Sequence, residues 1–354
     1  MCACELEVRF DREGRSYRPG EAVRGEVVVT ADQDVSCRGL AIELLWQTHG
    51  AGNKDQMVLD QIVLEAQQWS PGHPYRYPFA FTAPATPLTY HGHFLNVDHY
   101  VAARADLPMA IDAKASEEYL LLPGASSRRD YLAAVVDFTQ SQPAKSGLVA
   151  KAIGWFLLPV ILGLLAVLLM ALLPILFAVG IVVVVRRWLA ERRLGRVTVG
   201  VNAPEVGSSA SPGAMSVVGR FGSWLRGDRI HGISPGEPVR FNVRFQPRTQ
   251  VDVDRVSARL VGAEECRSGS GTDAKRHTRA LCDEQVVLAQ GLACFPGAPV
   301  DLAGELGVPD IEAYSFRSQD NALKWRLEVK IESPRWPDWS RDTTLALVPR
   351  TYPA

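Results

Sequence analysis

The sequence lacks an excess of charge of either sign and any cysteine framework. Lys and Arg together number 38 and Asp and Glu 39, so the formal net charge is -1. A basic excess is what neutralises phosphates in nucleic-acid-binding proteins, so no nucleic-acid partner is expected. The 6 cysteines form no C-x-x-C pair, which predicts free, mostly buried thiols rather than a disulfide or zinc framework.

Motifs that carry catalysis or bind cofactors are also missing. The sequence contains no G-x-S-x-G, H-E-x-x-H, Walker-type glycine-rich loop or dinucleotide-binding fingerprint. We therefore expect no enzymatic activity and no cofactor.

One group of histidines has a spacing that suits a metal. His91, His93 and His99 lie near Asp98, and imidazole with carboxylate is a donor set for zinc. The alternative places His91 in a turn and His99 on the solvent face of the next strand. We follow this alternative and assign no metal site, with these histidines as the only candidates.

A long apolar run divides the chain. Residues 152–185 contain no charged side chain, whereas a spanning helix needs about 20 apolar residues. The run predicts a membrane segment, either one span with an interfacial lead-in or a short helical hairpin bent near Pro174. Basic residues on both flanks favour the hairpin with both of its ends in the cytoplasm.

Aromatic and basic residues at the ends of this run are predicted to lie at the membrane interface. These residues are Trp155, Arg186, Arg187, Trp188, Arg192 and Arg193. The N-terminus has no basic stretch followed by an apolar one, so no cleavable signal peptide is expected. The prediction is an integral membrane protein, with the lipid bilayer as a partner and both globular domains in the cytoplasm.

The two flanks of the apolar run repeat one another. Residues 17–45 align with residues 233–261 without a gap. Further along, Tyr100 pairs with Trp325 in the same alignment. A repeat of this length predicts two domains of one fold.

Each copy contains a Pro-Gly turn that precedes an alternating strand. Pro19 and Gly20 in the first copy correspond to Pro235 and Gly236 in the second. Both turns are predicted to share one geometry, with positive φ at the glycine.

The remaining pattern is typical of β-structure. Apolar and polar residues alternate in short runs that turns separate, and residues 61–64 match residues 285–288 in such a run. Short strands at this spacing favour antiparallel sandwiches. The predicted fold class is all-β, with two tandem antiparallel, immunoglobulin-like β-sandwich domains joined by a helical transmembrane hairpin.

The repeat also predicts the domain boundaries. The first sandwich takes residues 1–125, the linker and membrane segment residues 126–194, and the second sandwich residues 195–354. The second copy carries an insertion at about residues 204–229, which is either a short amphipathic helix or a Gly/Ser-rich loop.

The chain resembles the arrestin superfamily. The resemblance rests on the Pro-Gly-Glu-x-Val turn in both copies and on residues 87–92, which are similar to the Pro-x-Ser-Tyr-x-Gly turn of that family. The superfamily includes arrestins, α-arrestin-type adaptors and bacterial sporulation-control proteins. It implies an arrestin-like pair of sandwiches.

The expected function is that of a membrane-anchored adaptor or scaffold that binds a protein partner at the cytoplasmic membrane surface. The alternative is a membrane-active or transport-associated component that forms a homo-oligomer through its transmembrane hairpin, using small residues such as Gly163 and Gly180 as packing positions.

Overall fold

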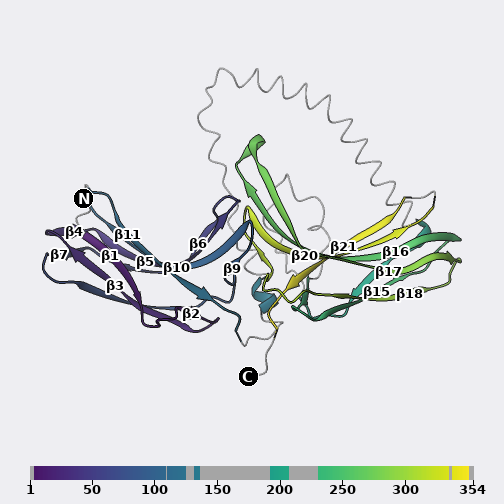
Figure 1. Cartoon of the computed structure of the whole chain (residues 1–354), viewed down its shortest axis with the longest axis horizontal. Helices are drawn as coiled ribbons and strands as arrows, with labels where there is room; N and C mark the ends of the chain where they lie inside the picture. Colours follow the sequence, from purple (N-terminus) through teal and green to yellow (C-terminus); the bar gives the residue numbers. More distant parts are fainter. Residues whose placement is uncertain are drawn as a thin grey trace, which may run out of the picture.

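The chain forms two β-rich lobes that lie end to end (Figure 1). The computed structural model describes residues 4–108, 110–124, 131–135, 192–206, 230–334 and 337–350. Nearly all of the regular structure in these ranges is strand. The all-β part of the predicted fold class is therefore confirmed.

The N-terminal lobe is a sandwich of two main sheets. One sheet has the strand order β1 (Cys4–Phe10), β3 (Ala22–Ala31), β8 (Tyr75–Thr82). The facing sheet has the order β2 (Ser16–Tyr17), β11 (Ala113–Leu121), β10 (Leu95–Asp106), β5 (Gly39–Gly50), β6 (Gln56–Leu64), and β9 (Tyr90–His91) pairs with β10. A small ribbon consists of β4 (Val35–Cys37) and β7 (Gln67–Trp69).

The C-terminal lobe repeats this arrangement. Its smaller sheet has the order β12 (Thr198–Val201), β15 (Pro238–Phe245), β18 (Val300–Gly307). Its larger sheet has the order β13 (Glu205–Val206), β14 (Ile230–Ile233), β21 (Trp339–Leu347), β20 (Asn321–Glu332), β16 (Val251–Ser268), β17 (Lys275–Cys294), and β19 (Phe316–Arg317) pairs with β20. A short 3₁₀ turn, η2 (Gly271–Asp273), lies at the tip between β16 and β17.

The strand pairings of the two main sheets correspond between the lobes, apart from β13 with β14 in the C-terminal lobe and the separate β4–β7 ribbon in the N-terminal lobe. The only parallel pairings in the described sheets are β2 with β11 and β14 with β21, which stand at equivalent places. Alternate residues of β3 and β15 face the cores, among them Val27 and Val243. Period-2 alternation thus encodes the buried face of each strand.

The register corrects one pairing of the sequence repeat. Trp325 lies opposite Gly262 on β16, and the equivalent strand pair places His99 opposite Trp46. The counterpart of Trp325 is therefore His99 and not Tyr100. A shift of one residue moves a side chain to the other face of a sheet, and both His99 and Trp325 are buried.

Two short helical segments, residues 131–135 and 192–194, lie near the two ends of the predicted linker. Tyr131 and Leu132 are buried in the N-terminal core, and Leu194 is buried in the C-terminal core. Most of the predicted linker and of the predicted insertion, residues 136–191 and 207–229, lies outside the described residues.

The prediction of a transmembrane hairpin is wrong, because the helices in the described ranges are too short to span a bilayer. Among the described residues, no helix combines the length and the apolar character needed to cross a bilayer. A helix over residues 131–135 rises only about 7.5 Å, whereas a hydrocarbon core measures about 30 Å. Residues 152–185, which gave rise to the prediction, lie outside the described residues. The integral membrane assignment, the bilayer as a partner and the alternative function through the hairpin are not retained.

Candidate functional site

A buried carboxylate of the C-terminal lobe binds the backbone of the N-terminal lobe where the two lobes meet. Glu264 on β16 has 0% exposure. Its Oε1 accepts hydrogen bonds from the amides of Phe94, at 2.7 Å, and Leu95. Its Oε2 accepts one from the amide of His93 at 3.3 Å. A buried charge is tolerated only with such partners, so this contact fixes how the lobes meet.

A second buried carboxylate makes the reciprocal contact. Asp55 follows β5 in the N-terminal lobe, and its Oδ2 accepts hydrogen bonds from the Ser318 hydroxyl at 2.6 Å and the Asp320 amide at 2.8 Å. The side-chain amide of Asn321 donates to the same oxygen at 2.9 Å and to Thr48 Oγ1 at 3.0 Å. Each lobe therefore inserts one carboxylate into the other.

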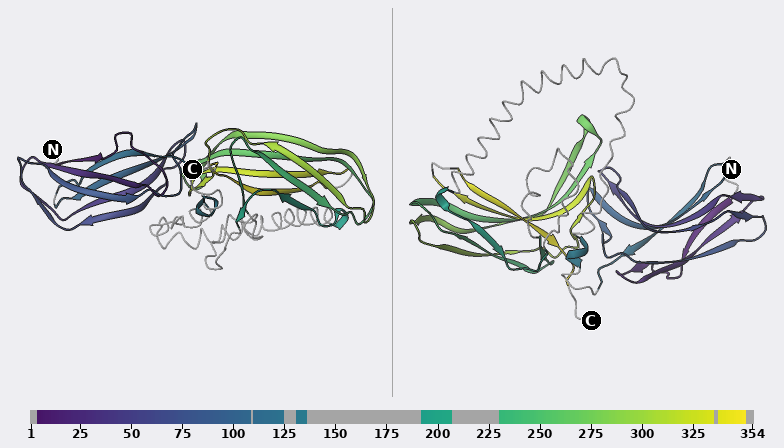
Figure 2. Two further views of the ribbon diagram at one scale, coloured as in Figure 1. Left: turned by 90° about the horizontal axis from the view of Figure 1, so that it is seen from below. Right: turned by 180° about the vertical axis from the view of Figure 1, so that it is seen from behind.

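Apolar side chains fill the space between these polar contacts. Rings of Trp46 and Phe316 meet edge to face, with centroids 5.5 Å apart. The cluster is shared between the lobes and consists of Trp46, Leu95, Val97, Cys266, Phe316 and Leu323. We call this cluster, together with the Glu264 and Asp55 contacts, the lobe seam. The lobes remain end to end in both views of Figure 2.

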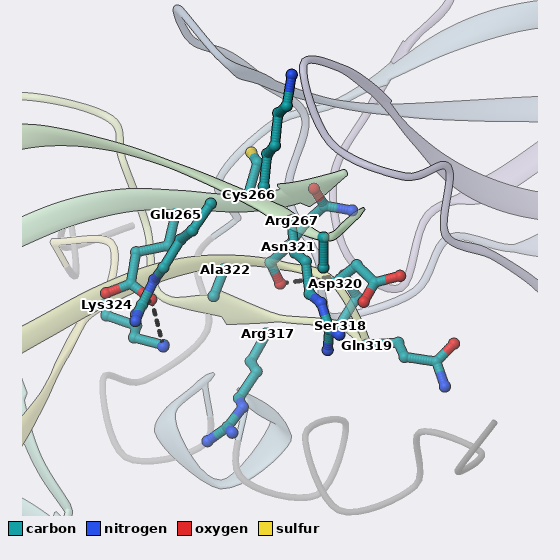
Figure 3. Close-up of a pocket in the computed structure, with 13 residues that line it drawn as sticks. Glu265, Cys266, Arg267, Arg317, Ser318, Gln319, Asp320, Asn321, Ala322 and Lys324 are labelled. Atoms are coloured by element: carbon teal, nitrogen blue, oxygen red, sulfur yellow. Dashed lines mark hydrogen bonds and ion pairs between the residues drawn. The ribbon is translucent and has the colours of Figure 1, made fainter. Parts of the chain in front are cut away.

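A cleft of about 300 Å³ opens beside the lobe seam on the C-terminal lobe. Figure 3 shows Glu265 and Lys324 turned toward one another, 2.6 Å apart, and Arg317 pointing away from them. Burial alone would raise the pKa of Glu265, but hydrogen bonds from Lys324 and Arg276 outweigh burial and lower it. Burial raises the pKa of Cys266 to about 12, so its thiol is not ionised at neutral pH and is a poor nucleophile. The cleft therefore offers a ligand charged and polar side chains, but not a reactive thiol.

The outer edges of the two large sheets are more open to a partner. Strand β6 ends the sheet of the N-terminal lobe and β17 ends that of the C-terminal lobe, and neither has a second strand neighbour among the described strands. Large apolar side chains are exposed along these edges, at Val58, Val63 and Val287, and at Phe295 directly after β17. The described part of the chain exposes only Ile111 and Leu122 besides them.

The same exposed valine recurs in both copies of the repeat. Val63 lies opposite Ala41 and Val287 lies opposite Ser257 in the two equivalent strand pairs. Val63 is 62% exposed and Val287 is 43% exposed. The matched segments 61–64 and 285–288 therefore occupy equivalent edges.

The histidines that the sequence singled out do not gather at one point. His99 is buried, contrary to the expected solvent face, and its Nε2–H donates to the Pro87 carbonyl at 3.0 Å. Burial lowers the pKa of His99 to about 4. The ring of His93 packs against Phe94, with centroids 4.5 Å apart. His91 turns to Asp98 on the outer face of the sheet.

Two residues that the sequence reading missed complete a polar cluster around Asp98. His91 Nε2 lies 2.7 Å from Asp98 Oδ1, and His49 Nδ1 lies 2.7 Å from Asp98 Oδ2. Glu118 joins His91 and Asp98 in a group whose ligand-type atoms lie within 4.8 Å of one another. His49 and Glu118 come from β5 and β11, so only knowledge of the strand register would have found them.

The turn residues of the two copies have matching backbones. Gly20 has a φ of +84° and Gly236 a φ of +64°, a region that L-residues rarely adopt. Each glycine follows a proline, Pro19 or Pro235, and the proline ring fixes the φ angle of that preceding turn position.

The predicted membrane-interface residues divide into two groups. Trp155, Arg186, Arg187 and Trp188 lie outside the described residues. Arg192 and Arg193 instead belong to the short helix that leads into the C-terminal lobe, where the Arg193 carbonyl accepts a hydrogen bond from the Arg248 amide at 2.8 Å. The backbone of Arg193 is therefore attached to the C-terminal lobe.

Comparisons with known proteins identify no family. No family model matches the chain, and no curated protein matches it. The solved structures include 308 matching chains. One of them is the sporulation control protein Spo0M of Bacillus subtilis, with a TM-score of 0.31 and 20% identity over 35% of this chain.

The match spans about half of the Spo0M chain, 51% of its length. Sporulation-control proteins are among the classes that the sequence resemblance included.

Proposed function

We propose that this chain is a non-catalytic adaptor or scaffold, and that extended segments of protein partners bind as added strands along β6 and β17. The observation that carries the proposal is the exposed valine at the equivalent place in both edge strands, Val63 and Val287.

The backbone of an edge strand supports this mode of binding. One row of its amide and carbonyl groups faces away from the sheet and can pair with an incoming strand. Strand β17 extends from Lys275 to Cys294, which is long for an edge strand, and it pairs with β16 alone among the described strands. A partner segment would gain main-chain hydrogen bonds from the edge and side-chain contacts from the exposed valines.

The distribution of exposed apolar residues points to the same edges. Of the 6 large apolar side chains exposed in the described residues, Val58, Val63, Val287 and Phe295 lie on or directly after β6 and β17. Natural proteins usually protect sheet edges with charged residues, prolines or bulges. Both edge strands have a bulge, and β17 carries charged residues such as Lys275 and Asp283. The exposed valines are the apolar exceptions on these edges, and we propose that a partner covers them.

Two equivalent edges also suit a scaffold. The lobe seam joins the lobes through buried carboxylates, so the edges keep a fixed separation. A single molecule would then hold two partner segments at once. A second copy of this chain is the competing occupant of these edges.

A display selection with random peptides tests the proposal. The full chain is used as bait, and the selected peptides are then measured by fluorescence polarisation against Val63→Lys, Val287→Lys and the double variant. We expect peptides of alternating β-branched residues. Each single variant should weaken binding at one of the two edges by at least about tenfold, or about 1.4 kcal/mol, and the double variant should weaken binding at both.

Ile111→Lys is the matched control, because Ile111 is exposed but lies on neither edge. Equal binding to the double variant and to the control would contradict strand addition. Sedimentation of the chain alone distinguishes the competing occupant: a dimer that the two lysine substitutions dissociate would assign the edges to self-association.

A further inference from the structure

We propose a divalent transition-metal site, suited to zinc, on the outer face of the N-terminal lobe, with His91, Asp98 and Glu118 as its protein ligands. This site is separate from the edges proposed to bind partners, and it involves a histidine that the sequence reading set aside.

The three ligand groups have separations that a metal ion can bridge. His91 Nε2 and Asp98 Oδ1 lie 2.7 Å apart, and the ligand-type atoms of all three residues lie within 4.8 Å of one another. Zinc bonds of about 2.0–2.1 Å in a tetrahedron place ligand atoms about 3.3 Å apart. The 2.7 Å separation is shorter than this value and the 4.8 Å limit is longer, so small side-chain rotations would bring the ligands to bonding distance.

Three adjacent strands hold these ligands in place. Asp98 lies on β10, whose one edge pairs with β5. Strands β9, with His91, and β11, with Glu118, follow one another along its other edge. In the register, His91 faces Asn96 and Glu118 faces Tyr100, the two residues that flank Asp98 on its own face of β10. His91 and Glu118 are therefore the two diagonal neighbours of Asp98 along one edge of β10, and a sheet holds such ligands in fixed positions.

The carboxylate of Asp98 is buried without full hydrogen bonding. The side chain is 1% exposed, although it stands on the outer face of the sheet. His49 Nδ1 lies 2.7 Å from Oδ2, but no described group donates a well-directed hydrogen bond to that oxygen. Buried polar atoms are nearly always paired, and an ion is one of the partners that explain an exception. A cation held by Oδ1, His91 and Glu118 would bind the same buried carboxyl group, while His49 faces Oδ2.

The donor set selects the class of metal. Imidazole with carboxylate suits zinc and other first-row transition metals better than calcium or magnesium, which prefer oxygen donors. Three protein ligands leave one tetrahedral position for water. His49 contacts the other oxygen of Asp98 and acts as a positioning residue that orients the carboxylate.

The position of the site gives the metal a structural consequence. His91 is followed within four residues by the amides of His93, Phe94 and Leu95, which bind Glu264. A metal bound at His91 would tie this loop to β10 and β11. Metal binding should therefore stiffen the lobe seam.

Calorimetric titration of the full chain with Zn²⁺ alone, after treatment with a chelator, tests the site. We expect one site per chain, loss of that site in His91→Ala and Glu118→Gln, and affinity reduced about 10–100-fold in His49→Ala. Co²⁺ should replace Zn²⁺ and give the intense visible absorption of tetrahedral coordination. Zn²⁺ should raise the melting temperature of the wild type and not that of His91→Ala.

His73→Ala and His93→Ala are the matched controls, because both side chains are exposed and neither lies in the cluster. His91 is 57% exposed, so its substitution should leave the metal-free fold intact, which a melt without metal verifies. Titrations that show no zinc binding, or zinc binding that His91→Ala and Glu118→Gln leave unchanged, would overturn the proposal.

Discussion

Glu264 of the C-terminal lobe accepts a hydrogen bond from the Phe94 amide of the N-terminal lobe at 2.7 Å, in a position with no solvent exposure. Its counterpart in the first repeat is Thr48, which lies opposite Val97 as Glu264 lies opposite Leu323. Thr48 also contacts the other lobe, because its Oγ1 accepts a hydrogen bond from Asn321. The same position of the repeat thus contacts the opposite lobe in both copies, through a carboxylate in Glu264 and a hydroxyl in Thr48.

Glu264→Ala should destabilise the protein by about 3 kcal/mol or more, because three backbone amides lose their acceptor in a buried place. Urea denaturation measures the loss as a lower midpoint. The control is Glu305→Ala, which removes an exposed ion pair with Arg240 and should cost less than about 1 kcal/mol. Equal losses in the two variants would show that the Glu264 contact does not stabilise the seam.

Gly262→Ala should also destabilise the protein, by about 1–3 kcal/mol. A Cβ at this position would lie 2.6 Å from the Trp325 ring, and that ring is held by a hydrogen bond from Nε1 to the Ala313 carbonyl at 3.1 Å. Chemical denaturation of Gly262→Ala in a Trp325→Leu background supplies the control. The cost of the alanine should largely disappear there, and a cost unchanged by the smaller partner would contradict the steric explanation.

Stability should fall in mild acid because of His99. Burial lowers its pKa to about 4, whereas an unfolded chain has a histidine pKa of about 6.5. Between these values the unfolded chain binds a proton that the folded protein does not. The contribution of the neutral, buried His99 to the free energy of unfolding is therefore complete above about pH 6.5. This contribution is lost as pH falls to about 4, by up to about 3 kcal/mol.

His99→Gln tests this pH dependence, because glutamine does not titrate and keeps a donor for the Pro87 carbonyl. Denaturation midpoints measured between these two pH values should fall less steeply than those of the wild type. His73→Gln, at an exposed position, should keep the wild-type slope. A slope in His99→Gln as steep as that of the wild type would assign the acid sensitivity to other groups.

Gly20→Val should cost about 1 kcal/mol or more through backbone strain alone. The φ of Gly20 is +84°, and a Cβ there would meet nothing within 4 Å. Gly14→Val is a clean comparison, since Gly14 also has open space and no positive φ. Thermal melts should show the loss only in Gly20→Val, and similar melting temperatures for both variants would contradict the strain.

Local pattern in the sequence was enough to predict the two sandwiches. Alternation along residues 22–31 and 238–245 encodes which side of each strand is buried, and the Pro-Gly pairs mark the turns between strands. These features depend on neighbours in the chain, so they can be seen without a structure. The repeat added the inference that the two halves share one topology.

The transmembrane hairpin predicted from the long apolar run was wrong. Hydropathy reports a preference for apolar surroundings and does not by itself specify a structure. It predicted a helical hairpin, and the helices in the described ranges are too short to cross a bilayer. The sequence alignment also gave Trp325 the wrong counterpart. The aromatic match to Tyr100 was chosen, whereas the strand register makes His99 the equivalent residue.

The sequence by itself determined the all-β class, the repeat and the turn glycines, because residues close in the chain encode them. Only the tertiary structure decided that Glu264 and Asp55 cross between lobes, that His99 faces inward, and that His49 and Glu118 join His91 at Asp98. Each of these contacts joins strands that are distant in the chain, so it depends on register and on how the lobes pack. A shift of one residue in any of those strands would have turned the same side chains to the opposite face.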